Sequence, residues 1–116
     1  MGHVSSILIY PVKDEPGQSL DGVTIGLEGL DGDRRKKAPV HLVAAADYVE
    51  THPRANLVLD LDPGDLLELV GRRLRIGSVE LEVDEAARNC PGVYAAVPVP
   101  GDLRVGDEVT VGVVGS

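Results

Sequence analysis

The sequence predicts a mainly β fold, a small antiparallel β-barrel with one or two short helices. Short stretches with alternating apolar residues follow one another closely, and they do not alternate regularly with helices. A barrel is expected because closure leaves fewer strand edges exposed. At 116 residues the chain is long enough for one core, and we expect residues 1–116 to form a single domain.

In the first half of the chain, three strands and one helix are expected. Strands are predicted at 4–12, near 23–27 and at 40–43, where β-branched residues gather between turn-forming residues. Residues 44–51 contain helix-favouring alanines, and Pro53 is expected to end that helix. Between the second and third strands, the composition predicts a glycine-rich, charged loop.

The next segments read as a strand and a short ambiguous element. Residues 56–61 predict a strand that an Asp-Pro-Gly turn closes at 62–64. The apolar positions of residues 65–71 suit either a helical turn or a strand, and the pattern leaves both open.

Two stretches predict β-hairpins, with a strand at 93–99 between them. In residues 74–83 and 103–113, alternating strands flank a Gly-Ser or a Gly-Asp pair. Glycine at the first central position suits the type II′ turn of a two-residue hairpin.

Charge and composition exclude several classes of function. The formal net charge of −8 repels nucleic-acid phosphates and anionic lipid surfaces, and no apolar run approaches the roughly 20 residues that span a bilayer. We therefore expect no nucleic-acid partner and no membrane contact. A single cysteine cannot form an internal disulfide, which fits the reducing cytoplasm.

Positive charge is concentrated in two clusters, residues 34–37 and the arginines between 72 and 75. If they converge in space they can receive an anionic ligand, and otherwise they are solvated turns. The three histidines, His3, His41 and His52, are far apart and no paired CxxC occurs, so no metal site is predicted.

Cys90 is the residue whose side chain is best suited to react. Arg88 and Asn89 precede it, and Pro91 and Gly92 follow, which predicts a loop that enters a strand. A nearby guanidinium favours the thiolate that nucleophilic or sulfur-transfer chemistry needs. The alternative is a thiol that only packs as a small apolar group.

Several segments, taken in order, resemble the MOSC domain, which is named for the C-terminal domain of molybdenum cofactor sulfurases. The resemblance covers nearly the whole chain. The segments are VSSILIYPVKDEPGQSLD, GLEGLDGDRR, RANLVLDL, LVGRRLRIGSVELEV, Cys90, GVYAAV and LRVGDEV.

The resemblance implies a barrel-like domain that binds the pterin-based molybdenum cofactor or handles sulfur. By analogy Cys90 would be the catalytic residue, accepting sulfur as a persulfide. Asp33, Arg34, Arg54 and Asn56 correspond to the family's cofactor-binding stretches, and guanidinium groups suit the phosphate of the cofactor. The implied partners are a pyridoxal-phosphate-dependent cysteine desulfurase as sulfur donor and a molybdoenzyme as acceptor.

Two departures keep other functions open. Arg35 stands where family members commonly have histidine, and the segment between Cys90 and Val93 is short. Three functions therefore stay open: a sulfur carrier with sulfurtransferase-type activity, a non-catalytic binding module, and a shortened paralogue that keeps the fold without sulfur transfer.

Overall fold

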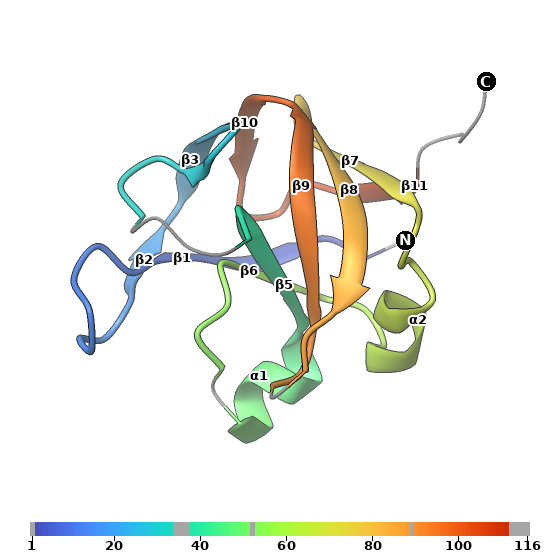
Figure 1. Cartoon of the computed structure of the whole chain (residues 1–116), viewed down its shortest axis with the longest axis horizontal. Helices are drawn as coiled ribbons and strands as arrows, with labels where there is room; N and C mark the ends of the chain where they lie inside the picture. The colour runs from blue at the N-terminus through green and yellow to red at the C-terminus, as the bar shows by residue number, and fades with distance from the viewer. Residues whose placement is uncertain (1, 34–37, 52, 89, 112–116) are drawn as a thin grey trace.

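The computed structural model describes residues 2–33, 38–51, 53–88 and 90–111, and these form a mainly β structure (Figure 1). The strands are β1 (Val4–Ile9), β2 (Gln18–Leu20), β3 (Gly22–Gly26), β4 (Gly29–Leu30), β5 (Val40–Ala44), β6 (Leu57–Leu59), β7 (Arg73–Ile76), β8 (Val79–Ala86), β9 (Val93–Val99), β10 (Gly101–Arg104) and β11 (Val109–Val111). The helices are α1 (Ala45–Thr51) and α2 (Pro63–Leu67). The mainly β class with two short helices is confirmed.

The strands form two sheets. The larger has eight strands in the order β11-β7-β8-β9-β5-β6-β1-β2, and the smaller has the order β10-β3-β4. Neighbouring strands run antiparallel except β5 and β6, which are parallel and are joined through α1. Figure 1 shows both helices at one end of the structure and β3 with β10 at the other.

Within the described residues, the strands do not close into the predicted barrel. Strand β11 pairs with β7 and strand β2 pairs with β1, so the larger sheet has two ends. The start of β1 still approaches β11, through a bridge between His3 and Glu108 and a hydrogen bond from Val109 N to Gly2 O at 3.1 Å. A single bridge does not make a ladder. Strands β3, β4 and β10 form the second sheet and do not extend the first.

The hairpin predicted at 74–83 is confirmed. Strands β7 and β8 pair with Ile76 opposite Val79, which leaves Gly77 and Ser78 as the two central residues. Gly77 has a φ of +60°, as the first central position of a type II′ turn requires.

The hairpin predicted at 103–113 is wrong. Strand β10 pairs with β3 and strand β11 pairs with β7, so the two never meet. The turn there is centred on Val105 and Gly106, with Asp107 N donating to Arg104 O at 3.1 Å and Gly106 at a φ of +95°. Glycine at the second central position is typical of a type II turn, which splays strands instead of pairing them.

Both helices follow from local sequence. Helix α1 spans Ala45–Thr51, one residue shorter than the predicted 44–51, because Ala44 is the last residue of β5. The open choice after β6 resolves as helix α2, in which Pro63 occupies the first turn and Asp62 caps it by accepting from Gly64 N at 2.8 Å. Neither helix in the described ranges is long and apolar enough to cross a membrane.

The main core lies between the larger sheet, the smaller sheet and α2. Ile25 and Leu103 enter it from the smaller sheet and Leu66 enters it from α2. A second apolar cluster lies on the opposite face of β5 and β6 and consists of Leu8, Tyr10, Val43, Ala55 and Val58. Strand β5 is therefore buried on both faces, and its one polar residue, His41, is only 5% exposed.

We predict that Gly77→Ala lowers the free energy of unfolding by about 1–3 kcal/mol, because an L-residue is strained at this φ. A Cβ there would also lie 2.5 Å from Asp102 O. The control is Gly26→Ala, whose Cβ meets nothing within 4 Å and whose effect should stay within about 0.5 kcal/mol. Urea denaturation of both variants measures the difference, and equal stabilities would contradict the turn assignment.

Candidate functional site

Cys90 lies in the loop that joins β8 to β9, as the sequence predicts. Ala87 N donates to Gly92 O at 3.0 Å and closes this loop just before the first residue of β9. The thiol is half-buried, neither in the core nor fully in water. The neighbouring Gly92 has a φ of +100°, and a Cβ there would collide with Leu42 O and lie 2.9 Å from His41 Nε2. Glycine thus lets the loop press directly against β5.

Two polar side chains from adjacent strands, His41 and Tyr94, lie near the sulfur of Cys90. His41 and Tyr94 are opposite each other in the β5–β9 ladder, with ring centroids 5.0 Å apart. His41 Nε2 lies 4.0 Å from Cys90 Sγ and 2.9 Å from Pro91 O. Tyr94 pairs with His41 in this ladder, and burial, followed by the charge of the nearby Cys90, raises the pKa of the Tyr94 hydroxyl. The hydroxyl therefore stays protonated beside the sulfur.

Asn56 links this group to the other end of the site. Its side chain is fully buried: Oδ1 accepts from His41 N at 3.0 Å, and Nδ2 donates to Leu8 O at 3.2 Å and to Asp33 Oδ2 at 3.0 Å. The side-chain amide of Asn56, a residue predicted to bind a cofactor, thus hydrogen-bonds to other groups of the protein. Its position contributes to the site by holding β5, β1 and Asp33 together.

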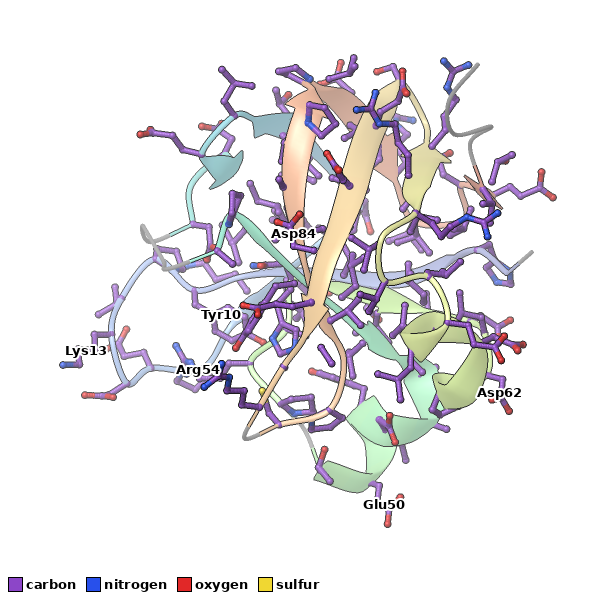
Figure 2. The ribbon with its side chains drawn as sticks, turned by 45° about the vertical axis from the view of Figure 1, so that its right-hand side comes forward. Tyr10, Lys13, Glu50, Arg54, Asp62 and Asp84 are labelled. Atoms are coloured by element: carbon purple, nitrogen blue, oxygen red, sulfur yellow. The ribbon has the colours of Figure 1, made fainter. Side chains whose placement is uncertain are left out.

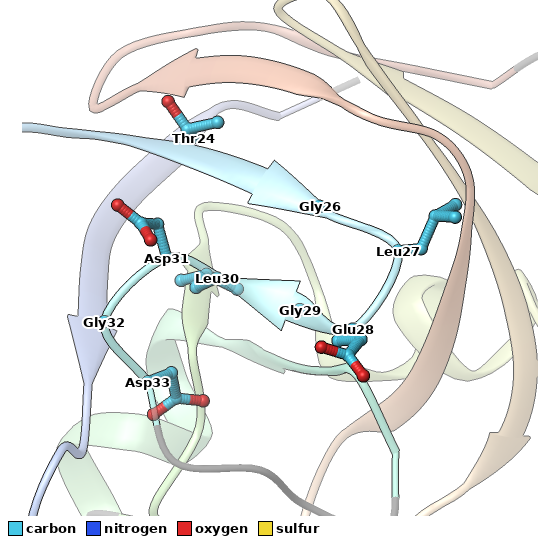
Figure 3. Close-up of a pocket in the computed structure, with 9 residues that line it drawn as sticks. All are labelled: Thr24, Gly26, Leu27, Glu28, Gly29, Leu30, Asp31, Gly32 and Asp33. Atoms are coloured by element: carbon cyan, nitrogen blue, oxygen red, sulfur yellow. The ribbon is translucent and has the colours of Figure 1, made fainter.

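Asp33 ties the segment after β4 to this network. Its Oδ1 accepts from Tyr10 N at 2.7 Å, and its Oδ2 is the partner of Asn56. The residue also borders an open pocket of about 640 Å³ that the β3–β4 hairpin lines (Figure 3). The carboxylates of Glu28 and Asp31 border the same pocket, so the described part of its lining is acidic.

Arg54 presents a preorganised cation next to this network. Its guanidinium lies over the ring of Tyr10, with Cζ 4.3 Å from the ring centroid, and Nη1 donates to Glu15 O at 2.8 Å (Figure 2). Gly17 covers the same ring, because a Cβ there would lie 2.5 Å from Tyr10 Cε1. The Tyr10 hydroxyl donates to Ala55 O at 3.2 Å, and burial raises its pKa, so the ring stays neutral under the cation.

The two basic clusters have different outcomes. Residues 34–37, which include the predicted cofactor-binding Arg34, lie outside the described residues. In the second cluster, Arg73 and Arg75 face glutamates on β8: Arg75 Nη2 lies 3.4 Å from Glu80 Oε2, and Arg73 Nη2 lies 3.9 Å from Glu82 Oε2. These exposed pairs neutralise one another and place this cluster on a solvated hairpin.

The predicted residues Asp33, Arg54, Asn56 and Cys90 therefore belong to one chain of contacts. Cys90 meets His41, which meets Asn56; the path continues through Asp33 and Tyr10 to Arg54. His41, Tyr94 and Tyr10 are members that the sequence reasoning missed. A detectable signal was the histidine inside the otherwise apolar run VHLVA, since a buried polar side chain requires partners.

No cluster of three or more metal-ligating side chains is found among the described residues. The chemistry that the arrangement itself offers is a half-buried thiol with adjacent hydrogen-bonding side chains, and a guanidinium held at the other end of the same network.

The fold matches solved structures of distant sequence. The YuaD protein from Bacillus subtilis has a TM-score of 0.77 at 16% identity, with 93% of each chain covered. YiiM from Geobacillus stearothermophilus has a TM-score of 0.73 at 14% identity, covering 99% of this chain and 78% of that one. YiiM from Escherichia coli has a TM-score of 0.71 at 14% identity, covering 100% of this chain and 72% of that one.

No protein-family model and no curated protein matches the sequence. At identities this low, the structural matches show a shared fold.

We predict that Gly92→Ala destabilises the protein by about 2–4 kcal/mol, because backbone strain adds to a collision with β5. The matched control is Gly71→Ala: Gly71 has a φ of +87°, but a Cβ there meets nothing within 4 Å. It should cost only the strain, about 1–2 kcal/mol. Denaturant unfolding separates the cost of backbone strain from the cost of the collision. Equal losses of unfolding free energy in the two variants would show that the loop does not press on β5.

Proposed function

We propose that the chain is a MOSC-type domain that carries sulfur on Cys90 and binds an anionic, pterin-type ligand beside it. The observation that carries the proposal is the placement of Cys90, half-buried on a loop with His41 Nε2 4.0 Å from its sulfur. A thiol kept only for packing needs no polar neighbours.

The sulfur would be received by exchange at a persulfide. The Cys90 thiolate attacks the terminal sulfur of a donor persulfide, a new S–S bond forms, and the donor's own S–S bond breaks. The donor leaves as a thiolate, and the transferred sulfur keeps its proton or negative charge. The step needs no oxidant, because sulfane sulfur moves from one thiolate to another. A pyridoxal-phosphate-dependent cysteine desulfurase is the donor that this chemistry suits.

The residues fit the proposed cofactor in part. Arg54 is exposed and suits a phosphate, because its guanidinium is already oriented by Tyr10 and Glu15. Cys90 would face the sulfur-accepting group. Asn56 is buried and Asp33 accepts two hydrogen bonds from the chain, so both would shape the site from behind. When bound, the molybdenum cofactor would supply the atom that accepts the sulfur.

We predict that a cysteine desulfurase with cysteine adds one sulfur atom to the reduced protein, and that Cys90→Ser abolishes the addition. Cys90 is the only cysteine, so intact-mass measurement assigns the atom without ambiguity. Dithiothreitol should remove the adduct, and an inorganic polysulfide should serve as a second donor. If the folded wild-type protein gains no sulfur from either donor, the chain is a binding module or an inactive paralogue.

We predict that Arg54→Gln weakens the binding of inorganic phosphate by about tenfold or more, because a hydrogen bond to a charged group contributes about 1.5–3 kcal/mol. Arg54→Lys should fall between, since it keeps the charge but loses the planar fork. The control is Arg75→Gln, at a position paired with Glu80. Phosphate titration followed by NMR measures the affinities. Equal binding by Arg54→Gln and Arg75→Gln would remove Arg54 from the ligand site.

A further inference from the structure

The loop between β1 and β2, residues 10–17, is tied to the rest of the protein through Arg54. Residues 11–16 are mostly exposed, and Figure 2 shows Lys13 at the outer end of this loop. Among the described residues, one hydrogen bond joins residues 11–16 to another part of the chain, from Arg54 Nη1 to Glu15 O at 2.8 Å. The order of this loop therefore depends on a single exposed guanidinium.

The aromatic ring under this guanidinium is fixed in place. Tyr10 is 6% exposed, its hydroxyl donates to Ala55 O at 3.2 Å, and its backbone N donates to Asp33 Oδ1 at 2.7 Å. Arg54 Cζ lies 4.3 Å from the centroid of the ring. The ring and the Glu15 carbonyl together select one orientation for an exposed side chain that otherwise samples many rotamers.

One edge of the guanidinium is left for a ligand. Arginine has five N–H groups in a planar fork, and a bidentate oxyanion accepts from two of them along one edge. Nη1 is held by Glu15 O, whereas no described residue accepts a hydrogen bond from Nε or Nη2, and no described carboxylate forms an ion pair with Arg54. An oxyanion can therefore bind the Nε–Nη2 edge while the bond to Glu15 stays in place.

We propose that the β1–β2 loop is the positioning element of the anion site. Glu15 O and the Tyr10 ring hold Arg54 ready for a bidentate oxyanion on its Nε–Nη2 edge, and the bound oxyanion in turn holds the loop. This inference rests on the ligand half of the proposed function and is independent of sulfur transfer at Cys90. Because both events use one side chain, each favours the other by the same factor.

Gly17→Ala tests the loop through the Tyr10 ring. The φ of Gly17 lies outside the left-handed region, so alanine adds no backbone strain, but its Cβ would lie 2.5 Å from Tyr10 Cε1 and 2.9 Å from Cζ. Because the ring is fixed, the loop has to give way, two residues from Glu15 O. We predict that Gly17→Ala weakens the binding of inorganic phosphate by about threefold or more, since Arg54 must then be ordered on binding. Phosphate titration followed by NMR measures the affinity.

Three matched controls should bind phosphate within about twofold of wild type at physiological ionic strength, where exposed charges are largely screened. Gly26→Ala makes the same substitution where a Cβ meets nothing within 4 Å. Glu15→Ala removes a carboxylate but keeps the carbonyl that accepts from Arg54. Lys13→Gln removes the cation of the loop itself. A larger loss in Lys13→Gln than in Gly17→Ala would assign the effect of the loop to its own charge and overturn the role of Glu15 O.

The reciprocal effect is measured on the loop. NMR relaxation of the backbone amides of residues 13–15 and of Gly17 reports their motion on the picosecond-to-nanosecond timescale. Phosphate should reduce this motion in the wild-type protein. In Arg54→Gln the loop should be more mobile before phosphate is added, and phosphate should not change it. Sodium chloride at equal ionic strength is the control and should leave the wild-type loop unchanged.

The outcomes separate this inference from the proposed function. If phosphate binds through Arg54 but Gly17→Ala binds it as tightly as wild type, or if the loop amides do not respond, the positioning role is overturned and the anion site stands. If the wild-type protein does not bind phosphate, the ligand half of the proposed function is refuted together with the coupling. Should Gly17→Ala fail to fold, the relaxation of the wild-type protein and of Arg54→Gln still decides.

Discussion

The buried amide of Asn56 is the interaction on which the rest of the site depends. Its backbone N–H donates to His41 O at 2.9 Å, and its side-chain Oδ1 accepts from His41 N. On the other side, its backbone O accepts from Leu8 N at 2.7 Å and its Nδ2 donates to Leu8 O. A fully buried amide is costly unless it is hydrogen-bonded, so these contacts favour one placement of β1 and β5 on the two sides of β6.

This constraint reaches the sulfur through the sheet. Because Asn56 hydrogen-bonds to the backbone of His41, it fixes where the imidazole starts, and the ladder places Tyr94 opposite His41. Gly92 then brings the cysteine loop close enough for contact. The same amide holds Asp33, which holds Tyr10 N, so the surface that carries Arg54 is fixed by the same network. Residues far apart in sequence are thereby joined in one hydrogen-bond network.

Sequence reasoning recovered what short-range physics determines. The alternating strands, the Gly77 turn, the helix before Pro53 and the loop position of Cys90 depend on local preferences, and all are present. The hairpin at 103–113 failed because the turn lies one residue earlier, at Val105 and Gly106, and because the partner strands β3 and β7 lie far away in sequence. Barrel closure failed for the same reason, since strand pairing over long separations leaves no local pattern.

The roles within the site were harder to predict, because burial decides them. Cofactor binding by Asn56 and Asp33 stays a prediction, and what the sequence did not show is that the buried Asn56 amide hydrogen-bonds to Leu8 O and to the Asp33 carboxylate. Conversely His41 was set aside because histidines without short spacing do not bind metal, although the absence of metal spacing says nothing about hydrogen bonding. A buried histidine beside a carbonyl is constrained to donate to it, and that constraint is invisible in the sequence.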